Sequence, residues 1–119
     1  SIITYGMGVY WSENQYTKDL KNVEIIDIRT LSPIDYDFIF NSVKKCGKCI
    51  VVTEEPKNNS FAQALSGYIQ ENCFEYLDAP IKVIGSENVP AIPLNSNLEK
   101  RTLPCSEKVN QAINELLSY

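Results

Sequence analysis

Histidine is absent from all 119 residues of this sequence. Its imidazole is the side chain most often used as a general base, as a metal ligand and as the central member of a serine or cysteine triad. Carboxylates and lysines can also support catalysis, but their spacing here forms no recognisable acid–base pair or ligand set. We therefore predict no catalytic, cofactor-binding or metal-binding residue in this chain, and we expect it to be inactive by itself.

Positive charge and long apolar runs are also scarce. Lys and Arg number 11 against 15 Asp and Glu, which gives a formal net charge of -4. A nucleic-acid-binding surface needs an excess of Lys and Arg, so no nucleic-acid partner is predicted. An acidic surface suits a basic protein partner better. No apolar run approaches the length that crosses a bilayer, so no membrane partner is predicted either.

The length and composition fit one globular domain over residues 1–119. A chain of this size buries about two thirds of the surface that its unfolded state exposes, which is enough for one core. Hydrophobic residues make up 44% and charged residues 22%, both ordinary for a globular protein. The chain begins at Ser1 inside an expected strand and without an initiator Met, so we expect it to be part of a longer polypeptide.

The hydrophobic pattern predicts strands that alternate with helices. Strands are expected at residues 1–5, 23–28, 49–53 and 81–84. One helix is expected over residues 8–20, and three more are expected to begin at residues 35, 60 and 106. Residues 85–104 are expected to form an extended loop. Such alternation implies an α/β fold in three layers, with a mostly parallel sheet covered by helices on both faces. Residues 49–53 are nearly all apolar, which is typical of a central strand.

The helical segments carry cap residues and apolar faces. Asp35 and Ser60 are expected to cap the helices that follow them. The helix after Ser60 has the best amphipathic pattern. Its apolar face comprises Phe61, Leu65, Tyr68 and Ile69. The apolar face of the last helix comprises Val109, Ala112, Ile113 and Leu116. The pattern over residues 8–20 is weaker, with Val9, Tyr16 and Leu20 on one face.

The Cys46-Gly-Lys-Cys49 motif could be a redox pair or half of a zinc site. A redox pair needs the amino end of a helix to lower a thiol pKa, whereas this motif lies where a helix is expected to end. A zinc site needs a second close pair, and Cys73 and Cys105 are far apart in the sequence. Ordinary reduced cysteines are the preferred interpretation, and they suit a reducing compartment.

Two short patterns lie at expected strand ends. Gly6-Met-Gly8 lacks the third glycine of a dinucleotide-binding loop, because Trp11 takes its place, so a tight turn from strand to helix is predicted. Glu54 and Glu55 lie where open α/β sheets bind ligands. Adjacent strand residues point to opposite faces, which favours a structural or interface role over acid–base catalysis.

Several longer stretches form one ordered series: VEIIDIRTLSPID (23–35), VKKCGKCIVVTEE (43–55), ENCFEYLDAPI (71–81) and NVPAIP (88–93), followed by LE (98–99) and LP (103–104). By their order and spacing these stretches resemble the carboxy-terminal domain of pyruvate dehydrogenase β subunits and their branched-chain relatives, within the transketolase carboxy-terminal domain family. ENCFEYLDAPI looks closest to the plastid form, so a plastid-type organelle is expected, with the mitochondrial matrix as the alternative. The sequence departs from the family at Asn59-Ser60, where a Gly-Gly pair is usual, and at Leu94, where a tyrosine is usual.

The resemblance implies a role in a larger enzyme. The holoenzyme would decarboxylate a 2-oxo acid with thiamine diphosphate and magnesium and acylate lipoyl groups. The cofactor would bind to the α subunit and to the amino-terminal domain of the β subunit. This domain would help to pair two β subunits and would dock the enzyme on the dihydrolipoyl acyltransferase core. Asp78 and Tyr119 match the positions that hold the core's basic binding domain. Alternatively, Asp78 caps the turn before Pro80.

Two other functions remain open from the sequence. One is the matching domain of a deoxyxylulose-phosphate synthase or transketolase, because the IDIRTLSPID segment is also found there. The other is a free-standing flavodoxin-like phosphocarrier or binding module. Such a phosphocarrier would need a phosphoacceptor at a strand end, and Asp27 is the candidate.

Overall fold

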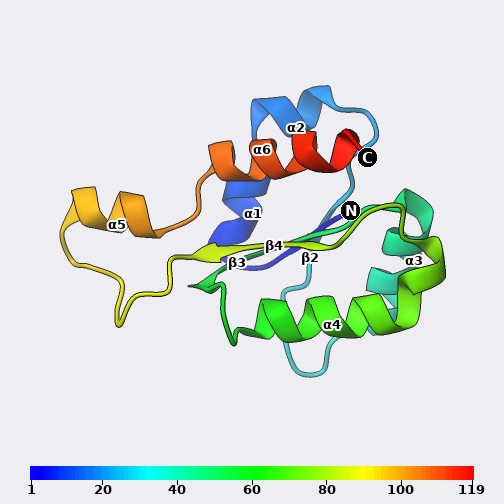
Figure 1. Ribbon diagram of the computed structural model, residues 1–119, viewed down its shortest axis with the longest axis horizontal. Coiled ribbons are helices and arrows are strands. Elements are labelled where there is room, and N and C mark those ends of the chain that lie inside the picture. The colour runs from blue at the N-terminus through cyan, green and yellow to red at the C-terminus, as the bar shows by residue number, and fades with distance from the viewer.

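The computed structural model describes residues 1–119 and arranges four strands in one sheet between two layers of helices (Figure 1). The strands are β1 (Ile2–Thr4), β2 (Ile25–Asp27), β3 (Ile50–Pro56) and β4 (Lys82–Ser86), in the spatial order β2-β1-β3-β4. All neighbouring strands are parallel. The predicted fold class, a three-layer α/β fold with a parallel sheet, is therefore confirmed.

Helices cover both faces of this sheet. One face carries α1 (Met7–Ser12), α2 (Gln15–Asp19) and α6 (Ser106–Leu117), and the other carries α3 (Tyr36–Cys46) and α4 (Phe61–Cys73) (Figure 1). No helix is both long enough and apolar enough to span a bilayer.

Two apolar clusters share the central strands. Side chains alternate between the two faces of a strand, so Ile3 and Val51 pack toward α3 and α4 while Ile2 and Val52 pack toward α6. Because β3 is buried on both faces, its first residues are an unbroken apolar run, as predicted. All four predicted inward residues of α6 are buried.

The predicted caps of α3 and α4 are confirmed. The side chain of Asp35 accepts a hydrogen bond from the N–H of Phe38 at 3.0 Å, and that of Ser60 accepts one from Gln63 at 3.1 Å. The turn between β1 and α1 is also confirmed. Gly6 has a φ of 56°, and a Cβ on Gly8 would collide with Thr4 Oγ1 and lie 3.2 Å from the carbonyl oxygen of Val52.

The single helix predicted over residues 8–20 is wrong. The chain leaves the helix after Ser12, and Asn14 starts α2 with a capping box. The Asn14 side chain accepts from the N–H of Thr17 at 3.2 Å, and the Thr17 hydroxyl accepts from the N–H of Asn14 at 3.1 Å. These bonds stabilise a new helix start and thereby end the previous helix.

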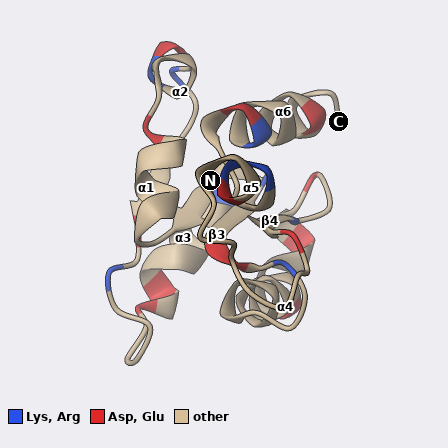
Figure 2. Cartoon of the chain, turned by 90° about the vertical axis from the view of Figure 1, so that its left-hand side faces the viewer, with Lys and Arg blue, Asp and Glu red and all other residues tan.

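The extended loop predicted over residues 85–104 is also wrong in part. It contains α5 (Ser96–Thr102), whose first turn is capped by the Asn95 side chain. Figure 1 shows that this segment projects from the body as an arm, and Figure 2 shows acidic and basic residues on α5. The arm exposes large apolar side chains, of which Leu94 is fully exposed. A short 3₁₀ turn (Phe74–Tyr76) after α4 was not predicted.

Candidate docking site

The two residues singled out for partner binding lie at the edge of the sheet formed by the amino ends of the strands. A hollow of about 300 Å³ opens there, and its lining includes Asp78, Ile2, Ile50 and Leu117. Tyr119 follows Leu117 by two residues and is 67% exposed. The carboxyl terminus and the amino terminus both lie at this side of the molecule (Figure 1). The structure thus places Asp78 and the end of α6 around one surface.

Asp78 is held by its backbone and leaves its carboxylate free. Its N–H donates to the carbonyl of Gly47 at 2.7 Å. Its side chain is exposed, lies against Gly47, accepts no hydrogen bond and has no cation within 4.0 Å. A residue that capped the turn before Pro80 would accept a hydrogen bond from that turn. This carboxylate therefore has no structural partner in the chain.

The Asp78 carboxylate lies beside the carboxyl end of α3. Gly47 is the C-cap residue of α3, with a φ of 70°, and the carboxyl end of a helix carries partial negative charge. Lys44 and Lys45 lie in the last turn of α3, but neither forms an ion pair with Asp78. A cation supplied by a partner would interact favourably with both the carboxylate and the helix end, so the arrangement is suited to binding a basic group.

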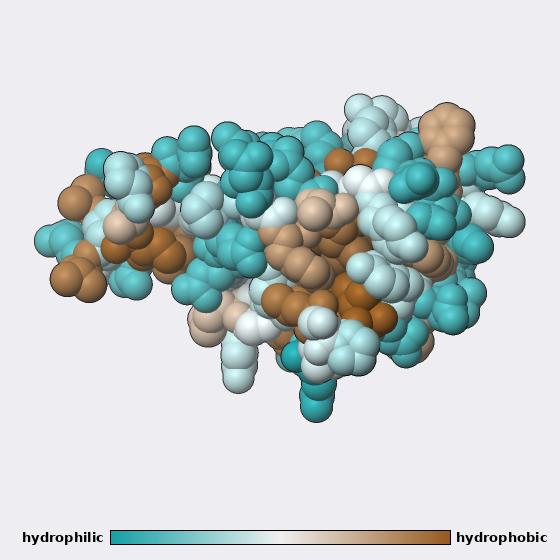
Figure 3. All heavy atoms as spheres, turned by 90° about the horizontal axis from the view of Figure 1, so that it is seen from below, coloured by the Kyte–Doolittle hydropathy of each residue, from teal (hydrophilic) through white to brown (hydrophobic).

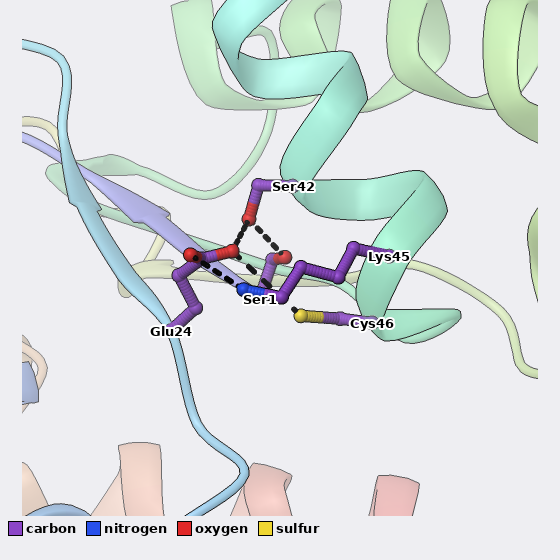
Figure 4. A network of polar contacts seen from close by, with 5 residues as sticks. All are labelled: Ser1, Glu24, Ser42, Lys45 and Cys46. Atoms are coloured by element: carbon purple, nitrogen blue, oxygen red, sulfur yellow. Dashed lines mark hydrogen bonds and ion pairs between the residues drawn. The ribbon is translucent and has the colours of Figure 1, made fainter.

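A polar network anchors the strands and α3 beside this hollow (Figure 4). Glu24 accepts from the Ser42 hydroxyl at 2.5 Å and pairs with Lys45 at 3.3 Å, and the Cys46 Sγ lies 3.9 Å from the same carboxylate. The hydrogen bond from Ser42 is the main cause that lowers the pKa of Glu24, and Lys45 adds to it. Cys46 lines the hollow, so this network fixes one of its walls.

A second hollow of about 330 Å³ adjoins Asp78 on its other side. It is lined by Gln70, Phe74, Leu77, Asp78, Ala79 and Pro80. Phe74 is 70% exposed. Apolar residues also gather on the face of the molecule that α3 and α4 form (Figure 3). Asp78 thus lies between two hollows lined partly by apolar side chains, and beside an exposed aromatic ring of the kind that is enriched at protein interfaces.

The cysteine motif is part of the fold. Cys46 ends α3, and Cys49 is buried in the core, where burial raises the pKa of its thiol to about 12. All four cysteines are free, and no three His, Cys, Asp or Glu residues are grouped so that they could hold a metal ion.

The other candidate residues lie at the opposite edge, where the strands end. Glu55 accepts from the Tyr5 hydroxyl and from the N–H of Phe61, both at 2.9 Å, so its role is structural. Glu54 and Asp27 are exposed and line a larger hollow of about 860 Å³. Asp27 pairs with Arg29 at 3.1 Å. These residues are not brought together with Asp78 and Tyr119.

Sequence reasoning missed Gly47 and Glu24 as parts of the site. A glycine at the expected end of a helix could have indicated the turn, because helices commonly end on a glycine in the left-handed conformation. Its contact with Asp78, 31 residues later, left no signal in the sequence. The hydrogen bond between Glu24 and Ser42 also left no signal in the sequence.

Comparison with known proteins identifies the fold family. Residues 1–109 match the family described as transketolase, C-terminal domain. The chain belongs to the transketolase C-terminal domain family. A solved structure described as a split gene transketolase, an inactive beta4 tetramer, aligns with this transketolase C-terminal domain at a TM-score of 0.72 over 98% of the chain, at 18% identity. That alignment covers 38% of the solved chain.

Several curated relatives of this transketolase C-terminal domain are named as beta subunits of 2-oxo-acid dehydrogenases. The chain is 33% identical to the 2-oxoisovalerate dehydrogenase subunit beta of Bacillus subtilis over 100% of its own length and 37% of the relative's. It is 33% identical to the pyruvate dehydrogenase E1 component subunit beta of Rickettsia bellii and 37% identical to that of Mycoplasma genitalium. Each of these two alignments covers 98% of the chain and 36% of the relative. The chain thus spans little more than a third of these relatives.

Proposed function

We propose that this chain is the assembly and docking domain of the β subunit of a thiamine-diphosphate-dependent 2-oxo-acid dehydrogenase. Relatives that the chain matches over 98% and 100% of its length are named as beta subunits of pyruvate and 2-oxoisovalerate dehydrogenases, which supports the enzyme class. In the proposed holoenzyme the domain pairs with a second β subunit and an α subunit. It also binds the basic peripheral domain of the dihydrolipoyl acyltransferase core.

The chain supplies none of the chemistry in this proposal. Magnesium is commonly bound by one or two carboxylates together with phosphate and water oxygens. In this proposal the cofactor and magnesium bind to the α subunit and to the amino-terminal domain of the β subunit, as the family resemblance implies. The isolated domain is therefore expected to show no decarboxylase activity.

The observation that carries the docking role is the unpaired carboxylate of Asp78 at the carboxyl end of α3. Removing its charge should cost affinity but little stability, because it makes no contact that holds the fold. Charge-assisted contacts contribute about 1.5 to 3 kcal/mol, so Asp78→Asn should weaken binding roughly tenfold or more. Deletion of Tyr119, which moves the terminal carboxylate and removes an exposed ring, should have a similar effect.

The measurement is the affinity of the full-length β subunit, assembled with its α subunit, for the purified binding domain of the acyltransferase. Glu54→Gln is the matched control, because it removes one exposed acidic charge at the opposite edge of the sheet. The affinity of the wild-type complex should fall as salt is raised, since attraction between opposite charges is screened. Wild-type affinity in both the Asp78 and Tyr119 variants would refute docking at this surface.

Two assignments within this proposal need separate tests. Pyruvate is the proposed substrate, and the relative from Bacillus subtilis makes a branched-chain 2-oxo acid the second candidate. Steady-state rates of the holoenzyme with pyruvate and with 2-oxoisovalerate would decide between them. A plastid-type organelle is the proposed location, from the ENCFEYLDAPI stretch alone. Imaging the tagged full-length protein with plastid and mitochondrial markers tests it.

A further inference from the structure

Gly47 is in direct contact with the Asp78 carboxylate. A Cβ at position 47 would collide with Asp78 Oδ2, lie 3.2 Å from Asp78 Cγ and lie 3.5 Å from the carbonyl oxygen of Tyr76. The backbone at the same position accepts the Asp78 N–H at 2.7 Å. Gly47 therefore contacts Asp78 in two ways. Its carbonyl fixes the backbone of Asp78, and because glycine has no side chain there is room for the Asp78 carboxylate.

Two different constraints act at position 47. The first is conformational, because a φ of 70° is costly for any residue with a side chain. The second is steric and concerns one group, the carboxylate of Asp78. Gly6 shows backbone strain without the steric contact. Its φ of 56° is also positive, although its ψ of -131° lies outside the left-handed helical region in which Gly47 lies, and a Cβ there would have nothing within 4 Å.

We propose that Gly47 is a positioning residue for docking, which keeps the Asp78 carboxylate at the carboxyl end of α3 where a basic group of the partner binds it. This inference rests on the proposed docking function. It gives the Cys46-Gly-Lys-Cys49 turn a role that is neither redox nor metal binding. The turn is the support on which the docking carboxylate lies.

The direct consequence concerns Gly47→Ala. The new methyl group takes the space of Oδ2, so the carboxylate must rotate away while its charge is unchanged. Affinity for the acyltransferase binding domain should fall about tenfold, close to the loss in Asp78→Asn, because a displaced carboxylate no longer makes the charge-assisted contact. The salt dependence of binding should become flatter for the same reason.

The experiment is a double-mutant cycle in the full-length β subunit assembled with its α subunit. Affinities for the purified binding domain are measured for wild type, Gly47→Ala, Asp78→Asn and the double variant, with Gly6→Ala as a control for backbone strain remote from Asp78. Gly6→Ala should lower the melting temperature through backbone strain and leave affinity unchanged. Gly47→Ala should weaken binding in the wild-type background but not further in the Asp78→Asn background. A merely structural role of Gly47 would weaken binding equally in both backgrounds and would overturn the proposal.

Asp78→Glu tests the same idea without changing position 47. It keeps the charge but adds one methylene, so its carboxylate cannot lie at the same point over Gly47. Affinity should fall about fivefold or more if position matters, and an affinity equal to wild type would contradict the inference. If Asp78→Asn weakens binding while Gly47→Ala binds as Gly6→Ala does, positioning by Gly47 is wrong and the docking function stands. If Asp78→Asn itself binds like wild type, the docking function is what fails.

Discussion

At the residue scale, one phenol connects elements that are distant in the sequence at the carboxyl edge of the sheet. Tyr5 Oη lies 2.8 Å from Thr53 Oγ1 and donates to Glu55 Oε1 at 2.9 Å. Glu55 in turn accepts from the first N–H of α4, at Phe61. Strand β1 is thereby connected through β3 to the start of α4. The pair Glu54-Glu55, for which the sequence favours a structural or interface role, is thus divided between one exposed residue and one structural residue.

Replacing this phenol tests its contribution to stability. Tyr5→Phe leaves the Glu55 carboxylate with one hydrogen bond fewer, so the free energy of unfolding should fall by about 1 to 2 kcal/mol. Urea denaturation measures the change. Tyr10→Phe is the matched control, since Tyr10 is 72% exposed and its loss should leave the midpoint unchanged.

The same phenol predicts a pH dependence. Burial raises the pKa of Tyr5 to about 12, with Glu55 contributing and the Thr53 hydrogen bond acting in the opposite direction. Folding therefore favours the protonated phenol. Its contribution to stability is complete below the unfolded pKa of about 10 and is lost as the pH rises toward the folded value. The stability difference between wild type and Tyr5→Phe should accordingly shrink between about pH 10 and 12, as measured by denaturation across that range.

At the scale of elements, the sequence predicts those features that depend on neighbouring residues. The strands, the caps at Asp35 and Ser60 and the inward face of α6 are set by local pattern, and the structure confirms them. The break between α1 and α2 depends partly on contacts that are not local. Asn14 donates to the side chain of Asn110, 96 residues later, as well as capping α2. Pattern alone could not predict that contact.

This capping box gives a prediction for α2. Asn14→Ala removes the cap and the bond to Asn110, and loss of a helix cap typically costs about 1 kcal/mol. The free energy of unfolding should fall by at least that amount in denaturant titration. Asn22→Ala changes an exposed asparagine outside the helices and should be neutral. An equal effect of the two substitutions would show that the box contributes nothing to stability.

At the scale of the whole molecule, the docking surface could be predicted only in part. Resemblance indicated Asp78 and Tyr119, but the hollow between them is built by residues from β1, α3, β3 and α6. These elements meet only because a parallel sheet brings the amino ends of its strands to one edge. The hollow beside Phe74 and the arm around α5 likewise depend on three-dimensional packing. Resemblance therefore indicated two of the residues, and the fold determines the surface around them.

The two apolar clusters on opposite faces should unfold as one unit. Val51 belongs to the cluster under α3 and α4, whereas Val52 and Trp11 belong to the cluster under α6. Because both clusters use β3, losing either one removes the strand that the other packs on.

Trp11 is the single tryptophan, so its fluorescence reports on the α6 side alone. Val51→Ala should lower the free energy of unfolding by about 2 kcal/mol through loss of buried methyl groups on the far side of the sheet. The midpoint measured by Trp11 fluorescence should shift as far as the midpoint measured by far-ultraviolet circular dichroism. A fluorescence midpoint that stays at its wild-type value would mean that the two faces unfold independently.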